Sequence, residues 1–110
     1  MRLLFVENHA IFAATVIEQF LDGHDVLVCP SLASARRAVM EHVKFDAVLV
    51  DYDLDDGKGD ELVRELRREG YSGRIIAASS HEDGNKALEL AGADAICAKS
   101  DMSRIASILD

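Results

Sequence analysis

The sequence predicts an α/β fold, a (βα)5 doubly wound parallel sheet, in a single domain that spans residues 1–110. Three observations support this prediction. Five short runs are almost solidly apolar, amphipathic stretches separate them, and the length of 110 residues is near the commonest size of a single domain. Strands without a polar face are typical of a parallel sheet that helices cover on both sides.

Each strand is expected where consecutive apolar residues stand between strand breakers. Pro30 ends the second apolar run, and Gly70 and Gly73 bracket the turn before the fourth. In chain order, the expected strands are residues 3–6, 25–29, 47–50, 75–78 and 95–98.

Each helix is expected where apolar residues recur three and four positions apart. Ser31 or Ser34 can cap the second helix, because a serine hydroxyl accepts hydrogen bonds from backbone N–H groups at a helix start. The apolar face of that helix consists of Leu32, Ala35, Ala38, Val39 and Val43. The other helices are expected at residues 9–21, at 60–69, in a stretch that ends at Gly92, and at 102–109.

The acidic balance of the chain argues against two classes of partner. Twenty Asp and Glu residues against twelve Lys and Arg residues give a formal net charge of −8. Binding to phosphate backbones depends on Lys and Arg, so we expect no direct contact with nucleic acid and none with an anionic membrane. No apolar stretch of the sequence approaches the ~18 residues that a membrane helix requires.

The two cysteines indicate a reducing compartment. Cys29 and Cys97 stand inside the apolar runs VLVC and AICA, without the C-x-x-C spacing of a metal or redox motif. We therefore expect both thiols to be reduced core residues of a cytoplasmic protein.

Polar residues that follow the apolar runs form a candidate site. Ligands of such sheets bind beyond the carboxyl ends of the strands, where this chain places Glu7, Asn8, Asp51, Ser79 and Lys99. Oxygen ligands from the first and third strand ends suit Mg²⁺, which prefers one or two carboxylates together with water and phosphate. A carboxylate nucleophile, a divalent cation, a hydroxyl and an ammonium are the groups that phosphoryl transfer needs.

These features resemble a known family over essentially the full length of the chain. Four segments carry the resemblance: LLFVENHAIF, DAVLVDYDLDDGKGDELVRELR, RIIAASS and AGADAICAKS. In this order and spacing they are similar to the receiver domain of bacterial two-component response regulators. The resemblance implies a flavodoxin-like, CheY-like fold with the sheet order 2-1-3-4-5, and makes residues 1–110 a receiver domain.

The resemblance also implies a role for each site residue. Asp51 would accept a phosphoryl group from a histidine kinase or a phosphotransfer protein, Ser79 would bond that group, and Lys99 would pair with it. The ligands of Mg²⁺ would be Glu7, Asn8, the Asp51 carboxylate and the backbone carbonyl of Asp53.

The implied protein is a signalling switch and not an enzyme, apart from its own phosphorylation and dephosphorylation. Its partners would be the phosphoryl donor, an output domain or partner protein, and a second copy of the chain if it forms a homodimer.

The sequence departs from the pattern of that family at five positions. The family usually has a carboxylate at Asn8, proline at Asp55, alanine at Ser80, an aromatic residue at Ile96 and proline at Ser100. An amide oxygen brings no charge to a cation, so Asn8 predicts weaker Mg²⁺ binding. Without an aromatic residue at Ile96, the usual coupling between the hydroxyl and a swinging ring lacks its ring.

Two other readings are open to the sequence, and a third is set aside. The departures favour a receiver-shaped interaction module that works without phosphorylation, in which replacing Asp51 would leave signalling unchanged. Asp51-Tyr52-Asp53 after an apolar strand resembles the DxD of haloacid-dehalogenase-type phosphatases, although that motif normally follows the first strand. An EF-hand calcium loop is set aside, because its glycine and glutamate positions hold Asp56 and Leu62.

The remaining acids of the loop are given no chemical role. We expect Asp55, Asp56 and Asp60 to be solvated charges ahead of a helix, where acids suit the helix N-terminus.

Overall fold

The computed structural model describes residues 1–41 and 44–110. Its strands are β1 (Arg2–Val6), β2 (Asp25–Cys29), β3 (Ala47–Val50), β4 (Asp53–Leu54), β5 (Gly57–Lys58), β6 (Arg74–Ala77) and β7 (Ala95–Ile96). Its helices are α1 (Ala10–Phe20), α2 (Leu32–Met40), α3 (Gly59–Arg68), α4 (Glu82–Ala91) and α5 (Ile105–Leu109), with a 3₁₀ helix, η1 (Lys99–Arg104), before α5.

Five of the strands form one parallel sheet in the order β2-β1-β3-β6-β7. Counted without the short strands β4 and β5, this is the order 2-1-3-4-5 that the sequence resemblance implied. In the register, Val6 pairs with Cys29 on one side and with Val50 on the other. The residues that follow β1 and β3 therefore emerge side by side at one edge of the sheet.

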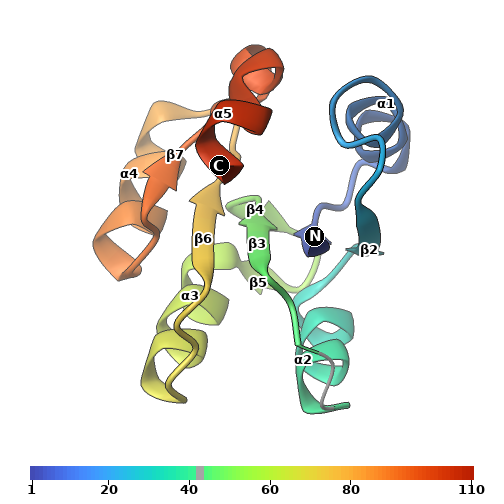
Figure 1. Ribbon diagram of the computed structural model, residues 1–110. Coiled ribbons are helices and arrows are strands. Elements are labelled where there is room, and N and C mark those ends of the chain that lie inside the picture. Colours follow the sequence, from blue (N-terminus) through green and yellow to red (C-terminus); the bar gives the residue numbers. More distant parts are fainter. Residues whose placement is uncertain (42–43) are drawn as a thin grey trace.

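Helices cover both faces of the sheet (Figure 1), and an apolar core is buried on each face. Leu4 of β1 packs with apolar residues of α2, α3 and α4, whereas its neighbour Leu3 packs with those of α1 and α5. This alternation follows from the two-residue period of a strand. Cys29 belongs to the first core and Cys97 to the second, so the sheet separates the two free, buried thiols.

The second helix begins as the sequence predicted. Ser31 is the N-cap of α2, and its hydroxyl accepts a hydrogen bond from the backbone N–H of Ser34 at 3.1 Å. The Ser34 hydroxyl accepts in turn from the Ser31 N–H, so both serines satisfy the helix start. Val43, expected on the apolar face of this helix, lies outside the described residues.

Two parts of the chain differ from the sequence-based prediction. The loop after β3 contains a short antiparallel hairpin, in which Asp53 pairs with Lys58 and Leu54 with Gly57. At the other end, β7 has two residues where four were expected, and Cys97 and Ala98 link it to η1. Lys99 therefore begins a 3₁₀ turn and does not directly follow a strand.

No helix within residues 1–41 and 44–110 is long and apolar enough to span a membrane.

Candidate functional site

Three polar side chains from distant parts of the chain meet at the carboxyl end of the sheet. Glu7 follows β1, Asp51 follows β3, and Lys99 begins η1. Glu7 is 1% exposed and Asp51 is 4% exposed, which is rare for carboxylates without a compensating charge. The pairing of β1 with β3 places these two residues next to each other, as the parallel topology predicts.

The ammonium of Lys99 compensates both carboxylates. Its Nζ lies 3.0 Å from Oδ2 of Asp51 and 3.0 Å from Oε1 of Glu7. The same atom lies 4.9 Å above the ring centre of Phe12, a residue of α1, in a cation–π arrangement. Burial alone would lower the pKa of Lys99, but the two carboxylates outweigh it and raise the pKa above its ordinary value.

The two oxygens of the Glu7 carboxylate differ in their hydrogen bonding. Its Oε2 accepts hydrogen bonds from the His9 N–H at 3.0 Å and from Lys99 at 3.2 Å. Its Oε1, although close to Lys99, accepts no hydrogen bond among the described residues. Burial and the nearby charge of Asp51 raise the pKa of Glu7, against the lowering effect of the His9 N–H and of Lys99.

The backbone after β3 holds Asp51 in a fixed orientation. The Tyr52 N–H donates to Oδ1 of Asp51 at 2.8 Å, and the Gly59 N–H donates to the Tyr52 carbonyl at 2.7 Å. Gly59 approaches so closely that a Cβ atom there would lie 2.0 Å from the Asp51 carbonyl oxygen. Glycine at the start of α3 is therefore a packing requirement of the segment that carries Asp51.

Ser79 is held at the end of β6 by Asn85, a residue of α4. The Ser79 N–H donates to Oδ1 of Asn85 at 2.8 Å, and the Asn85 amide donates back to the Ser79 carbonyl at 3.0 Å. Ser79 is 1% exposed and Asn85 is 4% exposed. The Ser79 hydroxyl accepts from the His81 N–H at 3.1 Å, which leaves its own hydrogen for a further acceptor.

Ser79 also lies next to the Asp51 segment. The Lys99 N–H donates to the Ser79 carbonyl at 3.2 Å. A Cβ atom at Gly84 would meet Tyr52 Cβ at 2.9 Å and the Ser79 hydroxyl at 3.0 Å. The structure thus brings four predicted residues, Glu7, Asp51, Ser79 and Lys99, to one end of the sheet.

The other two predicted residues make contacts away from Asp51. The Asn8 amide donates from Nδ2 to Oδ1 of Asp55 at 3.1 Å, while the Asn8 Oδ1 is buried and accepts no hydrogen bond among the described residues. The half-exposed side chain of Asp53 pairs with Lys58 across the β4–β5 hairpin, and this ion pair lowers the pKa of Asp53.

Asp55 and Asp56 are exposed and Asp60 lies in the first turn of α3, as expected, but each of the three also has a partner that the sequence did not predict. Asp56 accepts from the N–H groups of Leu32 and Ala33, at 2.8 and 3.0 Å, and so caps α2 from 24 residues away. These hydrogen bonds lower the pKa of Asp56. Asp60 pairs with Arg64 one turn along α3, and Asp55 bonds Asn8.

The expected Mg²⁺ can be tested against this donor set. Among residues 1–41 and 44–110, no three His, Cys, Asp or Glu side chains gather as they do in a metal site built from such side chains alone. Mg²⁺ needs fewer, because it takes one or two carboxylates and keeps several waters. Asn8 Oδ1, a buried oxygen that accepts no hydrogen bond within residues 1–41 and 44–110, and the neighbouring carboxylate of Glu7, whose Oε1 contacts Lys99, fit such a cation.

Sequence reasoning missed three residues of this site. Asn85, Phe12 and Asp55 each contact a predicted residue, but none stands at a strand end. Asn85 lies on the buried face of α4, three residues before Leu88, and its bonds to Ser79 are seen only in the fold. The acid-rich loop was noticed, yet its contact with Asn8 spans 47 residues and leaves no local signal.

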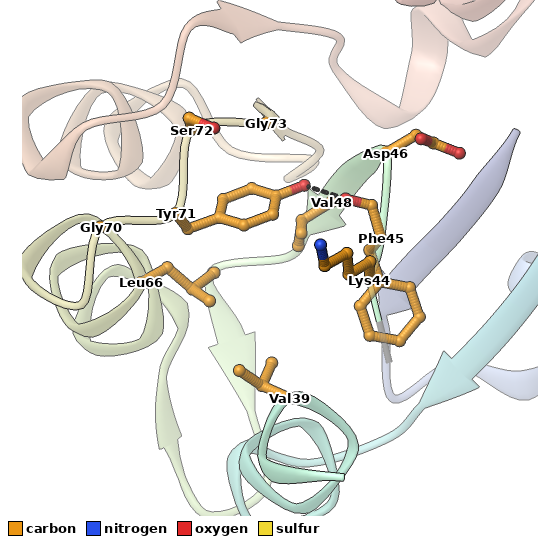
Figure 2. A pocket seen from close by; sticks show the side chains of 10 residues that line it. All are labelled: Val39, Lys44, Phe45, Asp46, Val48, Leu66, Gly70, Tyr71, Ser72 and Gly73. Atoms are coloured by element: carbon orange, nitrogen blue, oxygen red, sulfur yellow. Dashed lines mark hydrogen bonds between the residues drawn. The ribbon is translucent and has the colours of Figure 1, made fainter. Parts of the chain in front are cut away.

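A separate hollow of about 440 Å³ lies between α2 and α3, at the opposite end of the sheet (Figure 2). Val39, Leu66 and Tyr71 line it, and the Tyr71 hydroxyl donates to the Phe45 carbonyl at 2.9 Å. None of the predicted site residues borders this hollow.

The chain matches a known protein family and is similar to two curated proteins. A family model described as the response regulator receiver domain matches residues 3–110. Over 85 residues the chain is 29% identical to the DNA-binding transcriptional activator EvgA of Escherichia coli (strain K12), which covers 76% of this chain and 41% of EvgA. Over 100 residues it is 31% identical to a response regulator receiver protein of Anaeromyxobacter sp. (strain Fw109-5), covering 89% of this chain and 42% of that protein.

The fold has a close structural counterpart in a response regulator from Burkholderia pseudomallei, solved with a phosphorylated aspartic acid, a calcium ion and citrate. The TM-score is 0.84 at 21% identity, and the match covers 99% of this chain and 66% of the other. At this identity the likeness shows the fold alone. The chain spans about two fifths of the length of the two curated relatives.

Proposed function

We propose a function from one premise: this chain belongs to the response regulator receiver domain family, whose model matches residues 3–110. On that premise, the chain is a phosphorylation-controlled switch in two-component signalling, and Asp51 is the residue that accepts the phosphoryl group. It acts as a signalling component and does not turn over an external substrate.

One observation carries this proposal, the buried contact between Asp51 and Lys99 at the carboxyl end of the sheet. Burying an acid costs free energy, and pairing it with an ammonium recovers part of that cost. Such an arrangement suits an acid that reacts, because the ammonium can then pair with the negative charge of the group that the acid accepts. The backbone donor at Tyr52 holds the carboxylate ready, so positioning costs little at the moment of transfer.

In the proposed transfer, a carboxylate oxygen of Asp51 attacks the phosphorus of a phosphohistidine on the donor protein. A P–O bond forms as the P–N bond breaks, and the electron pair of that bond stays on the imidazole nitrogen. The Asp51 carboxylate thereby loses its charge. Lys99 then pairs with a phosphoryl oxygen, and the Ser79 hydroxyl donates to another.

Glu7, Asn8, the Asp51 carboxylate and the backbone carbonyl of Asp53 are the groups proposed to hold Mg²⁺. When bound, Mg²⁺ supplies positive charge that neutralises the phosphoryl oxygens. Since Asn8 contributes an uncharged oxygen, we propose weak binding, so that phosphorylation needs a high Mg²⁺ concentration.

The proposed partners are a histidine kinase or phosphotransfer protein and an output domain or partner protein. The name of EvgA, a DNA-binding transcriptional activator, supports an output of that kind in a longer chain. The cytoplasm is the proposed location, in keeping with two free thiols that face opposite cores. Contact with nucleic acid would belong to an output domain, because this domain carries a net charge of −8.

A second candidate function is an interaction module that works without phosphorylation. The observation that favours it is Ile96, which is half-buried and packs against the core shared by α2, α3 and α4. An aliphatic side chain already packed there has no ring to move inward. The family match offers no such support for a haloacid-dehalogenase-type phosphatase.

Amide spectra before and after phosphorylation separate the two candidates. The protein is labelled with ¹⁵N and treated with acetyl phosphate and Mg²⁺, and Asp51→Asn is treated in parallel. The switch predicts shifts that extend from Asp51 to residues of α4 and β7, and no such shifts in the variant. Shifts confined to the β3–β4 segment, or equal shifts in both proteins, would favour the phosphorylation-independent module.

A further inference from the structure

The hydrogen bond between Asn8 and Asp55 fixes the orientation of an amide at the candidate cation site. Asn8 Nδ2 donates to Oδ1 of Asp55 at 3.1 Å. An ionised carboxylate can only accept hydrogen bonds, so it must face the NH₂ group of an amide and never its oxygen. Asp55 therefore selects one of the two orientations of the Asn8 side chain.

The selected orientation turns the Asn8 oxygen to the interior. Asn8 Oδ1 is buried and accepts no hydrogen bond from any described residue. The neighbouring Oε1 of Glu7 also lacks a hydrogen bond among the described residues, but it lies 3.0 Å from the Lys99 ammonium. Leaving a buried acceptor such as Asn8 Oδ1 unsatisfied is costly in a folded protein. A cation bound beside the Glu7 carboxylate, at the same strand end, would satisfy it.

We propose that Asp55 is a positioning residue of the cation site, which holds the Asn8 amide with its oxygen toward the divalent cation. This inference rests on the proposed function, because it concerns the cation that the phosphoryl transfer uses. Asp55 also places a full negative charge behind an amide that has none. Groups that orient metal ligands in this way contribute strongly to metal affinity.

Asp55 is the acid of this loop that accepts a hydrogen bond from Asn8. Asp53 pairs with Lys58, Asp56 caps α2, and Asp60 pairs with Arg64. Asp60 provides a matched control, since its replacement removes the same charge from the same acid-rich segment without touching Asn8.

The test measures binding of Mn²⁺, which prefers the same oxygen ligands as Mg²⁺, from the electron paramagnetic resonance signal of the free ion. Asp55→Ala is expected to bind Mn²⁺ about tenfold more weakly than the parent protein, the usual cost of losing such a partner. Asp60→Ala is expected to bind as the parent does, and Asp55→Glu to recover most of the affinity.

A second background separates orientation from charge. Asn8→Asp introduces a carboxylate, whose two oxygens are equivalent and need no orientation. Asp55→Ala should therefore cost much less affinity in the Asn8→Asp background than in the parent. An equal cost in both backgrounds would overturn the inference, because it would indicate a charge effect alone, and so would an unchanged affinity of Asp55→Ala in the parent.

The fate of the proposed function is read separately, from the uptake of one phosphoryl group from acetyl phosphate. A parent protein that gains phosphate but binds no Mn²⁺ would overturn the role of Asp55 and leave the phosphoryl transfer intact. A parent protein that does neither would overturn both.

Discussion

Lys99 and Asp51, 48 residues apart in the sequence, meet through a 3.0 Å contact between the ammonium Nζ and the carboxylate Oδ2. The contact closes the carboxyl end of the sheet around a buried acid. Because Glu7 lies at the same ammonium, one positive charge faces two buried negative charges. The predictions below follow from this imbalance and from the groups that support it.

Removing the ammonium should destabilise the fold. Lys99→Met keeps the aliphatic stem but leaves Glu7 and Asp51 buried without a cation, and breaking a buried pair in this way costs about 3 kcal/mol. Urea denaturation in the presence of a chelator measures the loss, and Lys86→Met on the exposed face of α4 is the control. A Lys99→Met protein as stable as its control would mean that the ammonium does not offset the two acids.

Removing the charge of Glu7 should have the opposite effect at neutral pH. Burial raises the pKa of Glu7 above its ordinary value of 4.5, so the fold favours the protonated form. A raised carboxyl pKa contributes stability that is present below the unfolded value and is lost as pH rises through the folded value.

Glu7→Gln should therefore unfold at a higher temperature than the parent protein at neutral pH without divalent cations. The advantage should shrink as pH falls through the raised folded pKa, and should be gone below the unfolded pKa of 4.5, where the parent carboxyl is protonated in both states. Thermal unfolding of both proteins across this range measures it. If the difference in unfolding temperature between Glu7→Gln and the parent protein grew in acid, burial of the Glu7 charge would not be its cause.

Asn85 should matter as much as a core residue although its type is polar. Asn85→Ala leaves the buried N–H of Ser79 without its partner, while the Ser79 carbonyl still accepts from the Lys99 N–H, at a cost of about 2 kcal/mol. Lys86→Ala, one position along α4 and exposed, should cost nothing measurable. Chemical denaturation compares the two variants, and equal stabilities would exclude the bridging role of Asn85.

Tyr71 should titrate late, near pH 12. Burial raises the pKa of its hydroxyl from 10.0 to about 12. The neutral hydroxyl donates to the Phe45 carbonyl (Figure 2). The stability that this provides is complete below pH 10 and is lost as pH rises toward 12. Tyr71→Phe should remove the late step from the ultraviolet titration and cost about 1 kcal/mol.

Tyr52→Phe is the control for this titration, since it keeps Tyr71 and should keep the late step. A late step that persists in Tyr71→Phe would assign it to another group.

The strands and the positions of the site could be predicted because both depend on local patterns. A strand buried on both faces must be apolar throughout, and the residue after it must lie at the sheet edge. That reasoning located Glu7, Asp51 and Ser79. It failed for the hairpin after β3, whose strands of two residues each carry no periodic signal.

The supporting contacts could not be predicted, because they join residues that are distant in the sequence. Asp56 caps a helix that begins 24 residues earlier, and Asp55 bonds an amide 47 residues away. In the sequence both acids look like ordinary solvated charges beside Gly57. Their roles depend on where the β4–β5 hairpin places them, which is a property of the tertiary fold.

The central claim, that Asp51 accepts a phosphoryl group, is tested most directly by intact mass after incubation with acetyl phosphate and Mg²⁺. The expected result is one phosphoryl group on each parent chain, less of it when a chelator is added, and none on Asp51→Asn. Asn8→Asp, with a charged metal ligand, should reach the same product at a lower Mg²⁺ concentration. If neither the parent protein nor Asn8→Asp gains mass, or if Asp51→Asn gains as much as the parent, the claim is wrong.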